Sequence, residues 1–142
     1  MNVLQNIAYT AKVTATGGRE GVAKSNDGRL DLTLSTPKGL GGDDGQGTNP
    51  EQLFAAGYAA CFIGALKVVA AQENRRLPND TYINSEVSIG AIEEGFGIAV
   101  KLAVSLGDMD RFDAQKMVET AHKICPYSSA TRGNIDITLS VI

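Results

Sequence analysis

Apolar and polar residues alternate one by one along several short stretches of the chain, the pattern of a strand with one buried face. The clearest stretches are residues 7–14, 30–35, 83–89, 98–106 and 135–141. A further strand is expected at about residues 20–25, and Asn26-Asp27-Gly28 after it predicts a hairpin turn. The first three strands therefore form a meander, and the strands at 83–89 and 98–106 form a second hairpin.

A long helix is predicted from Pro50 to about Asn74. Asn49 fits the position before the first turn, and proline is favoured at the first helical position. Glu51 follows in the first turn, where a carboxylate is stabilised by the helix dipole.

The middle of this helix, residues 53–66, is apolar on every side. A helix of this kind must be covered all round, and one small sheet covers only one side. A second copy of the chain is the simplest cover for the other side. Gly57, Ala60 and Gly64 are small enough to allow a close approach of helices.

A second helix begins at Asp108 or Asp110, and Cys125-Pro126 ends it because the residue before a proline avoids helical geometry. The predicted order is βββ-α-ββ-α-β. Because strands cluster instead of alternating singly with helices, the fold class is α+β with mostly antiparallel sheets. We expect a single domain over residues 1–142.

Composition narrows the function classes. The chain has 142 residues and a net charge of −3 with no run of Lys or Arg, which argues against a nucleic-acid surface. Residues 1–6 lack the basic and apolar regions of a secretory signal. The apolar stretch at 53–66 has 14 residues, whereas a membrane span takes roughly 20. We therefore expect a cytoplasmic protein without a membrane-inserted helix.

The chemistry centres on the only two cysteines, Cys61 and Cys125. By composition alone they are two buried free thiols. Cys61 lies within the apolar helix, where burial raises the pKa of a thiol, so a reactive thiolate needs a nearby cation. Arg19 after Gly17-Gly18 is one candidate, and Glu51 could hold it by a bidentate ion pair. The local pattern alone favours Arg19 as a solvated turn residue. For Glu51, a residue that only suits the helix dipole is equally consistent with the spacing.

Spacing restricts such a site. Glu51 and Cys61 are ten residues apart on one helix, about 15 Å along its axis. If both serve one site, Glu51 of one chain must lie near Cys61 of another chain, at a dimer interface.

Other chemistries have weaker support. His122 is the only histidine, and without a Cys-x2-Cys spacing it does not complete a zinc site with the cysteines. His122 also has no evident partner that would orient it for a Cys-His hydrolase. We therefore expect His122 to lie at the C-terminus of a helix, near the negative end of the helix dipole. The glycine-rich loop at 38–47 lacks the Gly-Lys-Ser/Thr of a phosphate-binding loop.

Three blocks of sequence resemble the organic hydroperoxide resistance protein family, within the osmotically inducible protein C superfamily. They are residues 14–19 (Thr-Ala-Thr-Gly-Gly-Arg), residues 47–62 (from Gly-Thr-Asn-Pro-Glu to Ala-Cys-Phe) and residues 125–134, which begin Cys-Pro-Tyr-Ser. Ser129 stands where many members have asparagine.

The resemblance implies a thiol-dependent peroxidase that acts on alkyl and fatty-acid hydroperoxides and protects against oxidative stress. It implies that Cys61 is the peroxidatic cysteine, that Cys125 resolves it as a disulfide, and that Arg19 and Glu51 are the activating pair. It also implies an intertwined homodimer in which sheets wrap around long central helices. The implied reductant is the dihydrolipoyl group of a lipoylated protein, with no metal, flavin or haem.

Two alternatives stay open. A sheet wrapped around a buried helix could hold a fatty acyl chain, with both cysteines as core residues. A redox sensor could signal through the same disulfide.

Overall fold

The computed structural model describes residues 1–142, which form two compact units, Met1–Pro50 and Glu51–Ile142. The expectation of one domain over the whole chain stays a prediction.

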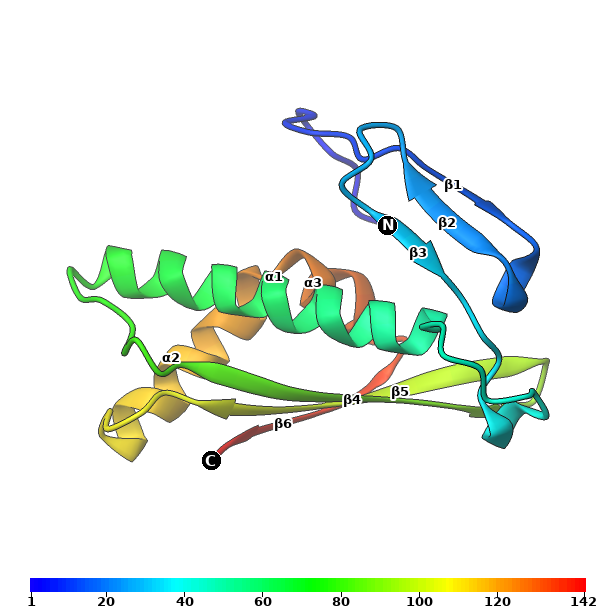
Figure 1. Ribbon diagram of the computed structural model, residues 1–142. Helices are drawn as coiled ribbons and strands as arrows, with labels where there is room; N and C mark the ends of the chain where they lie inside the picture. The colour runs from blue at the N-terminus through cyan, green and yellow to red at the C-terminus, as the bar shows by residue number, and fades with distance from the viewer. The chain divides into compact units, whose positions relative to one another are not determined.

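The first unit holds a three-stranded antiparallel sheet in the order β1-β2-β3 (Figure 1). Its strands are β1 (Val13–Thr16), β2 (Val22–Ser25) and β3 (Asp31–Thr33). The predicted meander is therefore confirmed.

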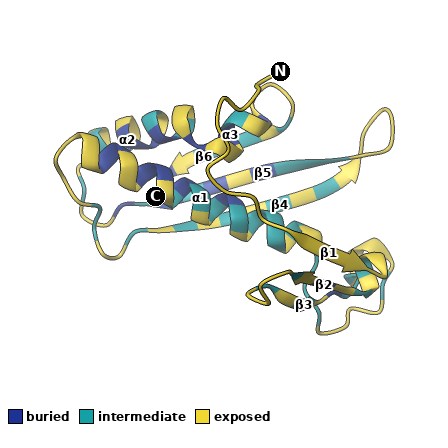
Figure 2. Cartoon of the chain, turned by 90° about the horizontal axis from the view of Figure 1, so that it is seen from above, coloured by how far each residue is buried: buried dark blue, intermediate teal, exposed yellow.

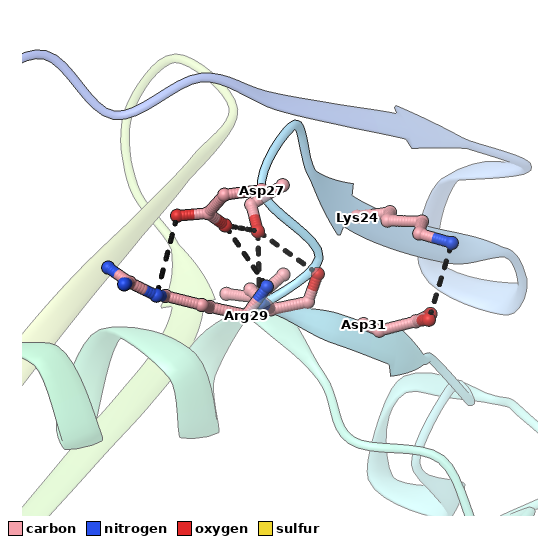
Figure 3. Close-up of polar contacts among 6 residues, drawn as sticks. Lys24, Asp27, Arg29 and Asp31 are labelled. Atoms are coloured by element: carbon pink, nitrogen blue, oxygen red, sulfur yellow. Dashed lines mark hydrogen bonds and ion pairs between the residues drawn. The ribbon is translucent and has the colours of Figure 1, made fainter.

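The turn between β2 and β3 forms around Asp27, which accepts hydrogen bonds from the Ser25 hydroxyl at 2.6 Å and the Arg29 backbone N–H at 3.0 Å (Figure 3). These two donors lower the pKa of the Asp27 carboxyl. Gly28 supplies the positive φ of 74°. The predicted hairpin signal is thus confirmed.

The first strand is shorter than its alternating pattern suggested. It begins at Val13, and Ile7 and Tyr9 are 73% and 79% exposed. Val13 pairs with Ser25, the last residue of β2. The Lys12 carbonyl oxygen still accepts from the Asn26 N–H at 3.1 Å. Because the β2–β3 turn then leads the partner strand away, residues 7–11 have no strand to pair with.

Two short 3-10 helices complete this unit. η1 (Gly18–Glu20) carries Arg19 and follows Gly17. Both Gly17 and Gly18 have positive φ values, of 73° and 59°. η2 (Lys38–Leu40) lies in the glycine-rich loop. The loop returns to the sheet where Thr48 forms a bridge with Leu34.

The second unit packs helices against a three-stranded sheet of order β4-β5-β6. Its elements are α1 (Pro50–Gln72, starting at the boundary), β4 (Tyr82–Ala91), β5 (Phe96–Ser105), α2 (Arg111–Ile124), α3 (Pro126–Thr131) and β6 (Asp136–Val141). β4 and β5 form the predicted antiparallel hairpin, whereas β6 runs parallel to β5. α1 lies across one face of this sheet (Figure 1).

One hydrophobic core joins α1, β5 and α2. Buried positions gather where these elements meet, and they are dark blue in Figure 2. The largest buried side chains are Tyr58, Phe62, Leu66 and Val69 of α1, Val100, Leu102 and Val104 of β5, and Met117 and Val118 of α2. Several other α1 residues stay partly or fully exposed, among them Val68 at 49%. As predicted, the sheet covers only one side of the helix.

The end of α1 is fixed by Asn74, which has a positive φ of 54°. Its backbone N–H donates to Ala71 O at 3.1 Å, and the next N–H, of Arg75, donates to Ala70 O at 2.9 Å. This is the Schellman arrangement, in which a left-handed residue closes the last turn. The predicted end near Asn74 agrees with the helix end at Gln72.

The second helix is capped by Asp110, whose carboxylate accepts from the N–H groups of Phe112 and Asp113. It ends at Cys125, as predicted, but the chain then enters α3 at once. The predicted α+β class with mostly antiparallel sheets is confirmed, and α3 is a short helix that the predicted order βββ-α-ββ-α-β did not include. Pro126 stops α2 and also suits the first position of a new helix, and the prediction used only its first property.

By length and composition alone, α1 could cross a membrane. The prediction that this helix is buried and does not span a membrane rested on a 14-residue apolar stretch, and it stays a prediction. The central helix of a soluble protein shares these properties, and six α1 side chains are buried against the rest of the unit.

Candidate active site

The structure brings the two cysteines together in the second unit. Cys61 lies in the middle of α1, and Cys125 is the junction residue between α2 and α3. Both are free thiols; Cys61 is half-buried and Cys125 is fully buried. The two thiols are near enough for Cys125 to affect the ionisation of Cys61.

These surroundings hold Cys61 in its protonated form. Burial raises the pKa of its thiol most, and the charge and hydrogen bond of Cys125 raise it further. The backbone N–H of Tyr127 lowers the pKa, because it stabilises the thiolate. Burial and Cys125 outweigh this one donor, so ionisation of Cys61 near neutral pH needs a further cation.

Cys61 opens onto an apolar groove of about 590 Å³. Residues of α1 line one side and residues around the α2–α3 junction line the other: Cys61, Gly64, Ala65, Val68, Gln72, Ile124 and Pro126. The groove holds no charged side chain. A second hollow of about 360 Å³ lies on the other side of Pro126, next to Phe54 and Tyr127. An organic group would find apolar surface beside the Cys61 sulfur.

An aromatic cluster holds α3 against α1. Tyr127 lies with its ring centre 5.6 Å from that of Tyr58 and 6.0 Å from that of Phe54. A Cβ at Gly57 would come within 3.0 Å of the Tyr127 hydroxyl oxygen. Gly57 is therefore needed for a close approach, but to α3 of its own chain.

Behind the cysteines lies a buried polar network that the sequence patterns did not predict. The Ser128 hydroxyl is 2.9 Å from Tyr58 Oη and 2.9 Å from His122 Nδ1, and Tyr58 Oη is 3.2 Å from Thr131 Oγ1. Tyr58, Ser128 and Thr131 are all buried. Hydroxyl residues within apolar stretches have no periodic signature, so only the fold brings them together.

His122 lies in the last turn of α2, as predicted. Burial, and then the charge of Arg132, lower the pKa of its ring, so the neutral form is favoured at pH 7. The Arg132 guanidinium donates to the carbonyl oxygen of His122 at 2.6 Å.

The other two candidate residues occupy different units. Arg19 lies in η1 of the first unit and is half-buried between the exposed residues Gly18 and Glu20. Glu51 lies in the first turn of α1 and is half-buried. Glu51 and Cys61 share one unbroken helix, and ten residues place them about 15 Å apart along its axis. The roles of Arg19 and Glu51 stay predictions.

No group of three or more His, Cys, Asp or Glu side chains in residues 1–142 is arranged to hold a metal ion. The polar groups that affect the ionisation of Cys61 are the Cys125 thiol and the backbone N–H of Tyr127.

Comparison with known proteins gives consistent matches. The family model described as OsmC-like protein matches residues 41–140. The organic hydroperoxide resistance protein of Xanthomonas axonopodis pv. citri is 59% identical over 96% of both chains. The crystal structure of OhrB, the organic hydroperoxide resistance protein of Bacillus subtilis, is 49% identical, with a TM-score of 0.86 over 96% of this chain and all of that one. A Legionella pneumophila protein titled an organic hydroperoxide resistance protein is 45% identical, with a TM-score of 0.90 over 96% of this chain and 98% of its own.

Proposed function

The chain belongs to the organic hydroperoxide resistance proteins of the OsmC-like family. We propose that it is a cysteine-based peroxidase that reduces organic hydroperoxides to alcohols. The observation that supports the proposal most is that the Cys61 and Cys125 thiols are near enough to affect each other's ionisation, beside an apolar groove. A peroxidase of this kind needs a nucleophilic sulfur, a second thiol within reach, and room for an organic group.

The proposed catalytic cycle has three steps. The Cys61 thiolate attacks the terminal oxygen of the hydroperoxide, the O–O bond breaks, and Cys61 becomes a sulfenic acid while the alkoxide takes up a proton as alcohol. The Cys125 thiol then condenses with the sulfenic acid, which forms a disulfide and releases water. An external dithiol reduces that disulfide by exchange and is itself oxidised.

Arg19 is the proposed cation for the first step, held by Glu51. Its guanidinium would stabilise the Cys61 thiolate and the charge that develops on the leaving alkoxide. Because Glu51 and Cys61 are far apart along α1, the proposed site combines them from two chains of a homodimer.

The remaining assignments complete the proposal. The substrates are alkyl and fatty-acid hydroperoxides, which suit the apolar groove next to Cys61. The reductant is a dihydrolipoyl group on a lipoylated protein, and no metal, flavin or haem takes part. The protein works in the cytoplasm, in protection against oxidative stress.

Thiol titration tests the cycle. The reduced protein should lose two thiols per chain on addition of one equivalent of cumene hydroperoxide, with one equivalent of alcohol formed. Cys61→Ser should abolish peroxide consumption. Cys125→Ser should complete one turnover and then stall with an oxidised Cys61, measured by mass spectrometry.

Two results would contradict the proposal. If Cys61→Ser still consumes peroxide, Cys61 is not the nucleophile. If the unmodified protein keeps both thiols, the groove is better explained as a binding site for an apolar chain.

A further inference from the structure

The buried network behind the cysteines connects three helices through four hydrogen bonds. They join His122 Nδ1 to Ser128 Oγ, Ser128 Oγ to Tyr58 Oη, Tyr58 Oη to Thr131 Oγ1, and Thr131 Oγ1 to the Ser128 carbonyl oxygen at 3.3 Å. The proposed peroxidase cycle uses none of these groups.

Counting protons fixes the direction of the network. Four hydrogen bonds need four protons, and the three hydroxyls supply one each. The carbonyl oxygen can only accept, so Thr131 donates to it; Tyr58 must then donate to Thr131, and Ser128 to Tyr58. The fourth proton must come from Nδ1 of His122, which leaves Nε2 of the neutral ring unprotonated.

The members of the network stand at regular distances from the cysteines. Tyr58 precedes Cys61 by three residues on α1, about one helical turn. His122 precedes Cys125 by three residues on α2, and Ser128 follows Cys125 by three on α3. The network therefore ties together the three backbone segments that set the distance between the two sulfurs.

Cys125 is fully buried at the junction between α2 and α3. Its backbone φ and ψ of −62° and 126° break the helix between α2 and α3. The His122–Ser128 bond spans that break, and so does the bond from the Arg132 guanidinium to the His122 carbonyl at 2.6 Å. Without these bridges α3 could turn relative to α2, and Cys125 would turn with it.

We propose that the hydrogen-bond network from His122 through Ser128 and Tyr58 to Thr131, in which each residue donates to the next, positions Cys125 next to Cys61 for disulfide formation. The inference rests on the proposed cycle and adds residues to its second step, in which the sulfenic acid of Cys61 and the thiol of Cys125 form a disulfide and water. These are positioning residues, because they act through the backbone that carries the two sulfurs.

Nitrogen NMR of the unmodified protein tests the direction of the network without any reaction. The chain has one histidine, so a tag-free sample labelled with ¹⁵N gives signals from a single imidazole ring. At pH 8 we expect a proton on Nδ1 and none on Nε2. A neutral ring that carries its proton on Nε2 would overturn the proposed direction.

Rapid-quench kinetics tests the positioning role. Reduced protein is mixed with one equivalent of cumene hydroperoxide, and peroxide loss, Cys61 sulfenic acid, disulfide and sulfinic acid are followed separately. Ser128→Ala and Tyr58→Phe should slow the disulfide step about tenfold or more relative to peroxide loss, since small misplacements of reacting groups have large effects on rate. More Cys61 should then reach the sulfinic acid when peroxide is in excess.

A conservative pair of variants separates this role from general packing. His122→Asn keeps an N–H donor near the position of Nδ1, so this variant should retain most of the rate of disulfide formation. His122→Leu has no such donor and should lose that rate. Thr120→Ala is the matched control, because the Thr120 hydroxyl bonds only within α2, to Lys116 O at 2.9 Å.

The outcomes distinguish this inference from the proposed function. If the unmodified protein forms the disulfide and Ser128→Ala and Tyr58→Phe form it equally fast, the positioning role is wrong and the peroxidase cycle stands. If the unmodified protein never loses its thiols, the cycle itself fails, whatever the tautomer of His122.

Discussion

The Cys61 sulfur has surroundings that oppose its proposed reaction. A thiol with an ordinary pKa of about 8.5 is only a few per cent ionised at pH 7. Burial and Cys125 raise the pKa of Cys61 above its ordinary value, and only the Tyr127 N–H acts in the opposite direction. The reactive form therefore depends on one strong cationic neighbour, for which Arg19 is our candidate.

Replacing Arg19 should make this dependence visible. In Arg19→Ala the pKa of Cys61 should rise, so at pH 7 the rate of alkylation by iodoacetamide should fall about tenfold for each pKa unit. The midpoint of the rate–pH curve should move to higher pH, because the thiolate then forms only in more alkaline solution. The measurement is the alkylation rate between pH 5 and 10.

Arg29→Ala is the control for that experiment. Arg29 lies in the β2–β3 turn with its side chain 90% exposed, 3.9 Å from Asp27 (Figure 3). Its removal should leave the alkylation curve unchanged. An unshifted midpoint in Arg19→Ala would show that another group ionises Cys61.

The two long helices of the second unit, α1 and α2, each have one end that local hydrogen bonds fix. Asp110 accepts two backbone N–H groups at the start of α2, at 3.0 and 3.2 Å. Asp110→Ala should therefore lower the free energy of unfolding by about 1 kcal/mol. Urea denaturation measures this change.

Asp110→Asn serves as the comparison, because its side-chain oxygen can accept the same bonds. We expect it to retain most of the stability that Asp110→Ala loses. Equal losses in both variants would indicate that the charge at the helix N-terminus matters more than the hydrogen bonds.

The elements were predictable where one local pattern decides them. Alternation placed both hairpins, and Asn49-Pro50 placed the start of α1. Patterns failed where tertiary context decides: residues 7–11 alternate without a partner strand, and Pro126 both ends a helix and begins another.

In the candidate site, too, local patterns predicted some features, and others depend on the tertiary fold. The sequence singled out both cysteines, but their proximity required α1 and the α2–α3 junction to meet. The network of Tyr58, Ser128 and His122 was not predicted, because its members come from three helices and no sequence pattern pairs them with one another. Their closeness to the cysteines becomes clear only from the fold.

At the scale of the whole molecule, α1 leaves apolar side chains exposed on one side. The sheet and α2 cover one side, while Val68 is 49% exposed and lines the groove at Cys61. We propose that a second copy of the chain covers this side, as the all-round apolar sequence of α1 predicts.

A charge in this groove should separate the two copies. Val68→Asp should convert a dimer into a monomer at micromolar concentration in analytical ultracentrifugation, because burying an unpaired carboxylate is costly. Thr138→Asp, at an exposed position of β6, is the control and should leave the mass unchanged. A monomeric unmodified protein would contradict the proposed dimer.

The two thiols that lie near each other beside the groove are 64 positions apart in the chain. A covalent bond between them would close a large loop and restrict the unfolded chain, which in the chain-entropy model stabilises the folded state by about 4 kcal/mol. Each proposed turnover would thus move the chain between a form held by non-covalent contacts alone and a form that is also cross-linked. The peroxide would supply the free energy for the tighter form, and the reductant would have to overcome it.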